Sequence, residues 1–205
     1  MTNEENERIT TARIVTNALH PYVVLAPAVA LVAYHESSTS EVWLKWTASA
    51  LLPAYLLPLA YMQARVILAA RTTGVQISFR SLFREQPAEL LLLACLFGIP
   101  STLILHSLGC PTSIIAAWVG VAVTGLVIAL INRGCRARIH LALLTTMVTS
   151  VVILFHGVSF IAVLLIPLLG ISRYQVGAHT PGQLVTGSLI GFATTVAVFQ
   201  GFGLL

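Results

Sequence analysis

Two short polar segments of the chain combine arginine with histidine, and each stands directly before an apolar stretch. One has the sequence NRGCRARIH and the other SRYQVGAHTPGQ. Guanidinium groups bind phosphate oxygens through paired N–H donors, and imidazoles exchange protons near neutral pH. These residue types together indicate phosphate chemistry. The side chains concerned are Arg136, Arg138, His140, Arg173 and His179.

The second segment resembles the third signature of the type 2 phosphatidic acid phosphatase superfamily. In that signature Ser-Arg is followed after five residues by His and after three more by Asp. Ser172, Arg173 and His179 match, and Gln183 stands at the Asp position. The resemblance implies that His179 attacks phosphorus to form a phosphohistidine while Ser172 and Arg173 bind the phosphate. It also implies that Gln183 orients the nucleophile.

The first segment matches the family's middle signature, Pro-Ser-Gly-His, only at His140. The resemblance implies that His140 is the general acid that protonates the leaving alkoxide. Arg136 and Arg138 would supply positive charge that other members take from a first signature, Lys, six residues, Arg-Pro. In the nearest counterpart here, Phe79 and Gln86 stand at the Lys and Arg positions.

The composition places these segments in a membrane. Of the 205 residues, 57% are hydrophobic and 9% charged, against about 45–50% and about 25% in soluble domains. This length suits a single domain, residues 1–205, of six or seven spans at roughly 20 residues each. We predict an all-α, polytopic transmembrane helical bundle with a polar N-terminal segment, 1–16. The resemblance implies that a phosphatidic-acid-phosphatase-like core covers 80–205.

Seven apolar stretches are candidate spans. The second is long and holds two prolines, which predict a kink, and the sixth is short. The chain has no internal repeat of fixed period, so the sequence does not indicate an inverted-repeat transporter. The stretches are 17–34, 43–68, 89–107, 112–131, 140–155, 157–171 and 184–204.

Alternating these spans puts all ten arginines on one side and Lys45 on the other. The positive-inside rule then predicts a cytoplasmic N-terminus and an external C-terminus. An even number of spans separates the two polar segments, so their histidines and arginines are predicted to meet at the cytoplasmic interface. Short loops favour the inner membrane of a prokaryotic cell.

The remaining histidines and the cysteines are interpreted as structural. A histidine at a helix end ordinarily bonds a neighbouring carbonyl or faces water, and four histidines are placed away from the arginines on this interpretation. Cys95, Cys110 and Cys135 have no metal-site spacing and are predicted to pack. No metal or cofactor is expected. The net charge of +4 is spread over short loops, so we expect no nucleic-acid partner. The four histidines are His20, His35, His106 and His156.

Two hypotheses from different classes remain. The first is a membrane-embedded phosphatase that hydrolyses a lipid or prenyl (di)phosphate. The second is a catalytically silent relative that serves as a lipid-binding or scaffold subunit of a membrane complex, because the signatures are incomplete. A channel or carrier ranks below both, since the apolar stretches hold almost no charged residues. Turnover by the purified protein would favour the first, and a stable partner without turnover the second.

Overall fold

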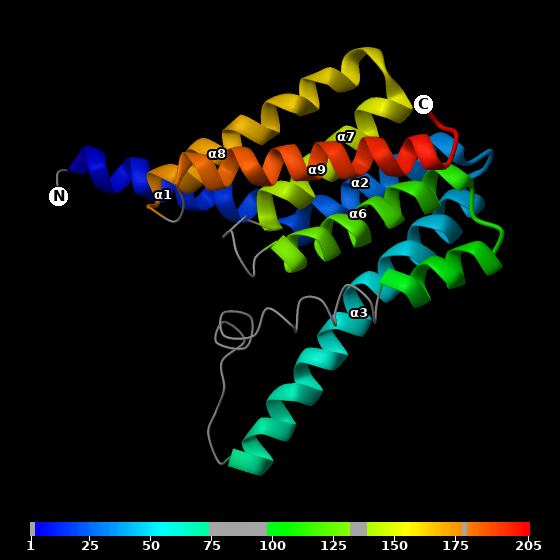
Figure 1. Cartoon of the computed structure of the whole chain (residues 1–205), viewed down its shortest axis with the longest axis horizontal. Helices are drawn as coiled ribbons and strands as arrows, with labels where there is room; N and C mark the ends of the chain where they lie inside the picture. The colour runs from blue at the N-terminus through cyan, green and yellow to red at the C-terminus, as the bar shows by residue number, and fades with distance from the viewer. Residues whose placement is uncertain (1–2, 74–97, 132–138, 178–179) are drawn as a thin grey trace.

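The computed structural model describes residues 3–73, 98–131, 139–177 and 180–205, and all regular structure in these ranges is helical (Figure 1). Residues 98–107 are also helical. The all-α prediction is therefore confirmed for these ranges. The labelled elements are α1 (Asn3–Ala18), α2 (Pro21–Glu36), α3 (Ser40–Thr73), α6 (Thr112–Ile131), α7 (Ile139–Phe155), the 3₁₀ helix η1 (Gly157–Leu164), α8 (Leu165–Gln175) and α9 (Pro181–Gly201).

Three of the described helices are long and apolar enough to cross a membrane. They contain Ser40–Leu68, Thr112–Ile131 and Pro181–Gly201, and a fourth span results if the bent pair α1 and α2 crosses as one unit. The segments Ile139–Phe155 and Ser159–Gln175 are apolar but shorter than 18 residues. At 1.5 Å per residue Ile139–Phe155 covers only about 25 Å of a hydrocarbon layer about 30 Å thick. The chain therefore has three to four candidate spans in the described ranges.

Most of the predicted apolar stretches coincide with helices. The stretch 112–131 has the bounds of α6, and α7 begins one residue before its predicted start. The long stretch 43–68 lies in α3, which continues without a break through Pro53 and Pro58. The polar segment 1–16, for which no structure was predicted, is mostly helical as α1. Only the last part of 89–107 falls within the described residues.

Helices α6, α7 and α9 pack against one another and are joined by hydrogen bonds between threonine hydroxyls. The Thr124 hydroxyl lies 2.9 Å from that of Thr146 and 2.6 Å from that of Thr194. Interhelical hydrogen bonds of this kind hold membrane helices together where lipid removes the hydrophobic driving force. On α9, Gly191 sits so close to α7 that a β-carbon there would collide with the carbonyl oxygen of Ala142. This packing fixes the start of α7 relative to the middle of α9.

A sharp turn after α7 sends the chain back along the bundle. His156 and Gly157 both adopt positive φ angles, 51° and 49°. Helix η1 and then α8 return beside α7, and α8 packs against α1 (Figure 1). The end of α8 is thereby brought to the same end of the bundle as the start of α7 and the junction of α1 with α2.

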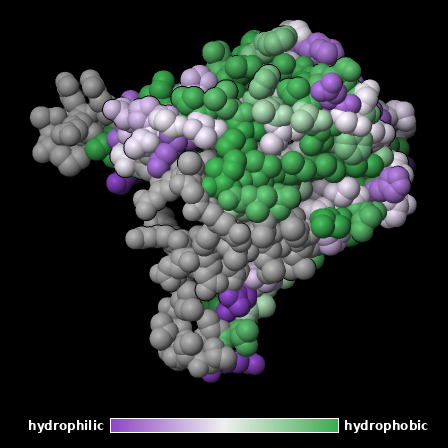
Figure 2. All heavy atoms as spheres, viewed as in Figure 1, coloured by the Kyte–Doolittle hydropathy of each residue, from purple (hydrophilic) through white to green (hydrophobic). Residues whose placement is uncertain are grey.

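On one face, the surface of the bundle has an apolar middle and more polar ends. Figure 2 shows hydrophobic side chains over the middle of this face, with hydrophilic ones toward its two ends. Large apolar side chains on α3 and α9 are exposed, which suits contact with lipid tails. They include Leu52, Leu56, Leu59, Val185, Leu189 and Phe192.

Candidate functional site

His20 lies at the break between α1 and α2. Helix α1 ends at Ala18 and α2 begins at Pro21, whose missing N–H is tolerated at a first helical position. The two helical segments, Ile9–Ala18 and Val23–Glu36, are bent by 41°. The His20 carbonyl accepts hydrogen bonds from the amides of Val23 and Val24 at 2.8 and 3.0 Å. These bonds fix the backbone from which the imidazole projects.

The ring of His20 meets the ring of His140, the second residue of α7. Their Nε2 atoms are 3.2 Å apart. The ring centroids are 4.9 Å apart and the rings are nearly perpendicular, at 79°. One Nε2 must carry a hydrogen and the other must accept it, since two bare nitrogens would repel. The contact therefore couples the tautomers of the two histidines.

Arg173 adds a positive charge to this pair. It lies in the last turn of α8 and is partly buried. Its guanidinium is close enough to interact electrostatically with His20. The described structure thus brings together one guanidinium and two imidazoles from three separate parts of the chain, which is a combination suited to binding an anion and exchanging protons with it. The name "His-Arg cluster" is used below for His20, His140 and Arg173.

Ser172 is buried in the same turn of α8, and its hydroxyl is already engaged. Its Oγ donates to the carbonyl oxygen of Leu168 at 2.8 Å. Only 4% of the residue is exposed. The hydroxyl would have to turn away from α8 to donate to a phosphate, so the phosphate-binding role of Ser172 stays a prediction.

Gln183 has a structural task at the start of α9. Its Oε1 accepts a long hydrogen bond, 3.5 Å, from the backbone N–H of Thr180. Thr180 and Gln183 form a capping box, and Pro181 occupies a first-turn position. The pattern Thr-x-x-Gln is a known signal for a helix start, and the sequence interpretation overlooked it. The predicted role of Gln183 in orienting His179 is not tested, because His179 lies outside the described residues.

Arg136 and Arg138 also lie outside the described residues. In the chain they end one residue before α7, and His179 directly precedes the capping residue Thr180. Among the predicted site residues that are described, His140 and Arg173 both approach His20. Gln183 and Ser172 are each held by their own helix.

The predicted placement of His20 is wrong. It was expected to lie away from the arginines, yet it contacts His140 and interacts with Arg173. The parity of spans held the missing signal, since four predicted spans separate His20 from His140, and an even number returns the chain to the same side.

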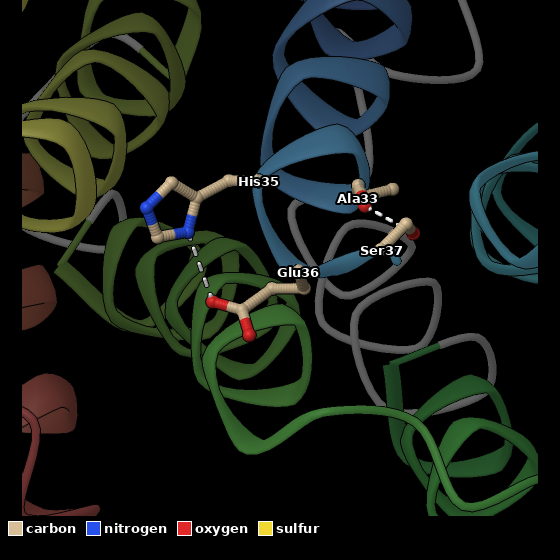
Figure 3. A network of polar contacts seen from close by, with 4 residues as sticks. All are labelled: Ala33, His35, Glu36 and Ser37. Atoms are coloured by element: carbon tan, nitrogen blue, oxygen red, sulfur yellow. Dashed lines mark hydrogen bonds and ion pairs between the residues drawn. The ribbon is translucent and has the colours of Figure 1, made fainter. Parts of the chain in front are cut away.

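The other histidines match their structural interpretation. Figure 3 shows His35 beside Glu36 at the end of α2, with Nδ1 and Oε1 separated by 3.3 Å. The His35 ring also packs on Phe155, at the far end of α7 from His140. His106 and His156 are exposed, and their carbonyls accept bonds from nearby turns.

Cys110 is a packing residue, as predicted. It belongs to the largest buried cluster, together with Trp46 and Ile114. Among the described residues, no group of three or more His, Cys, Asp or Glu side chains could hold a metal ion. A cavity of about 30 Å³ between α2, α3, α6 and α7 is lined by no charged residue. It offers no cation to offset the charge of a phosphate.

No protein-family model matches the chain, and comparisons with curated proteins and with solved structures found no match. The fold and the His-Arg cluster define the class: a protein whose described ranges are helical, with three to four candidate membrane spans in them and an imidazole–guanidinium cluster at one end of the bundle.

Proposed function

We propose that this protein is a membrane-embedded phosphatase that hydrolyses a lipid or prenyl (di)phosphate. One observation carries the proposal. His140 and Arg173 come from the two segments that resemble the phosphatase signatures; His140 contacts His20, and the charge of Arg173 acts on the same His20 ring. Both segments are identified by sequence motifs alone, so their proximity in the structure supports the proposal independently.

In the proposed reaction His179 attacks phosphorus, and an N–P bond forms as the P–O bond to the leaving group breaks. His140 gives a proton to the departing oxygen, and water then cleaves the phosphohistidine. Arg173, Arg136 and Arg138 bind the phosphate oxygens and offset their charge. The lipid tail stays in the bilayer, and no metal takes part.

The proposal includes the finer topology. Six or seven spans, with the core over 80–205, would put the His-Arg cluster at the cytoplasmic face of a prokaryotic inner membrane. This orientation is supported by the predicted distribution of positive charge, with all ten arginines on that side and Lys45 on the other.

The test is phosphate release by detergent-purified protein from a panel of prenyl phosphates, prenyl diphosphates and phosphatidic acid. We expect release by the wild type and a loss of at least about 10²-fold in kcat for His179→Ala, since a nucleophile is removed. His35→Ala, an exposed histidine at the other end of the bundle, is the matched control and should keep full activity. An unaffected rate in His179→Ala would refute the mechanism.

The silent relative remains the second candidate because of Gln183. An amide stands where the family has a carboxylate, and its oxygen bonds Thr180. An amide can accept a hydrogen bond but stabilises a cationic histidine less than a carboxylate does. No turnover on any substrate, together with a stable co-purifying membrane partner, would favour a lipid-binding or scaffold role.

A further inference from the structure

The His20–His140 contact has two chemical interpretations. A separation of 3.2 Å between Nε2 atoms fits the outer range of a direct N–H···N hydrogen bond. It also fits two ligands of one tetrahedral zinc ion, because two Zn–N bonds of about 2.0–2.1 Å put the nitrogens roughly 3.3 Å apart. The neighbours of the pair decide between the two.

Those neighbours favour the hydrogen bond. The charge of Arg173 acts on His20, and a divalent cation at the same place would be repelled by it. A structural zinc also needs four ligands and a catalytic one three, whereas the described residues supply no third His, Cys, Asp or Glu. An anion such as phosphate would instead be attracted.

We propose that His20 is a positioning residue for His140. Its Nε2 accepts the Nε2–H of His140, which fixes the orientation of that ring and directs its Nδ1–H toward the leaving oxygen. This inference rests on the proposed phosphatase function. His20 touches neither the phosphorus nor the leaving group in this scheme, and it acts through His140.

The proton balance follows from this assignment. Before the step His140 is an imidazolium with hydrogens on both ring nitrogens, and bound phosphate offsets its charge. When the P–O bond breaks, the Nδ1 proton moves to the departing oxygen, and His140 becomes neutral with its remaining hydrogen on Nε2. The bond to His20 is kept throughout, as the orienting partner of a catalytic histidine keeps its bond.

The break between α1 and α2 is what makes His20 suitable for this role. Its carbonyl is held by the amides of Val23 and Val24, and α1 is packed against α8. Because this backbone is already fixed, bonding His140 costs only the rotamer freedom of the His20 side chain. The ring is therefore preorganised before substrate binds.

The kinetic test compares His20→Leu with His20→Gln. Leucine removes the acceptor, whereas glutamine can place an amide oxygen near the same point without exchanging protons. We expect His20→Leu to lower kcat by about 10–100-fold with KM within about twofold, because a general acid contributes about 10²–10⁴ and is here only misplaced. His20→Gln should keep kcat within about fivefold of wild type, and His35→Leu should match wild type.

Two kinetic results would overturn the inference. Wild-type kcat in His20→Leu would show that the contact has no part in the reaction. Equal losses in His20→Gln and His20→Leu would mean that His20 acts through its own proton instead of by positioning. Thermal unfolding of each variant checks that the fold is kept.

A second measurement does not depend on turnover, so it separates this inference from the proposed function. The chain has six histidines, and ¹⁵N-histidine labelling gives a simple spectrum. We expect the His140 Nε2 resonance, assigned by its loss in His140→Gln, to shift when His20 is changed to Leu. An unchanged resonance would refute the hydrogen bond, and bound zinc that is lost with His20 would replace it with a metal site.

Discussion

A contact between two histidines 120 positions apart ties the first helix break to the start of α7. His20 and His35 are the same residue type, and both stand near an end of α2, yet their neighbours give them different chemistry. His20 faces another imidazole and a guanidinium, whereas His35 meets the carboxylate next to it in the chain. At the scale of single residues, the tertiary neighbours decide which histidine belongs to a site.

Cys110 gives a prediction at the same scale. Burial raises the pKa of its thiol to about 11, although nearby Lys45 acts in the opposite direction. Only the thiolate reacts with maleimide, and a rise from the usual value of 9.0 lowers its fraction at pH 8 by about 100-fold. With Cys95 and Cys135 changed to Ser, we expect slow labelling at pH 8 that speeds up with pH and on unfolding. Labelling of the folded protein as fast as that of the unfolded one would contradict the burial.

At the scale of elements, the packing of α9 against α7 depends on Gly191, a position where no side chain fits. Buried positions on α9 recur every three or four residues, at Leu184, Gly187, Gly191, Thr195 and Phe199. Gly191 meets the backbone of Ala142, and the hydroxyls of Thr146 and Thr195 bond to the carbonyl oxygen of Gly191 itself. A backbone neighbour cannot move aside as the end of a side chain can.

Gly191→Ala should therefore destabilise the bundle. The added methyl group would collide with the Ala142 carbonyl oxygen, and overpacking of this kind costs about 1–3 kcal/mol. Gly201→Ala, on the same helix with open space around it, is the matched control and should be neutral or slightly stabilising. Thermal unfolding in detergent measures both. Equal melting temperatures for the two variants would show that α7 and α9 separate at little cost.

At the scale of the whole molecule, the two ends of the bundle should face opposite sides of the membrane. Ser38 lies in the turn between α2 and α3, and Gln175 ends α8 near the His-Arg cluster; both are exposed. In a background without native cysteines, we expect Ser38→Cys to react with an impermeant maleimide in intact cells. Gln175→Cys should react only after permeabilisation, because the arginine-rich side stays in the cytoplasm. The reverse pattern would invert the predicted topology.

Much of the fold was predictable from the sequence because lipid forces each apolar stretch to satisfy its own backbone as a helix. That constraint fixed α6 and α7 almost to the residue. The apolar pattern does not predict α1, because this helix is polar and is stabilised by packing against α8. Within the site, Arg173 and His140 were found through motifs, but His20 has no motif around it and is indicated in the sequence only by the even number of predicted spans between it and His140.

The length of α3 has a consequence for its slope in the bilayer. Its apolar part, Ser40–Leu68, has 29 residues and is about 44 Å long, while the hydrocarbon layer is about 30 Å thick. A stretch this long lies at a steep tilt or leaves the hydrocarbon before its end. Figure 1 shows α3 running obliquely away from the other helices. A thicker bilayer would let α3 stand more upright, while the threonine-linked packing of α6, α7 and α9 stays as it is.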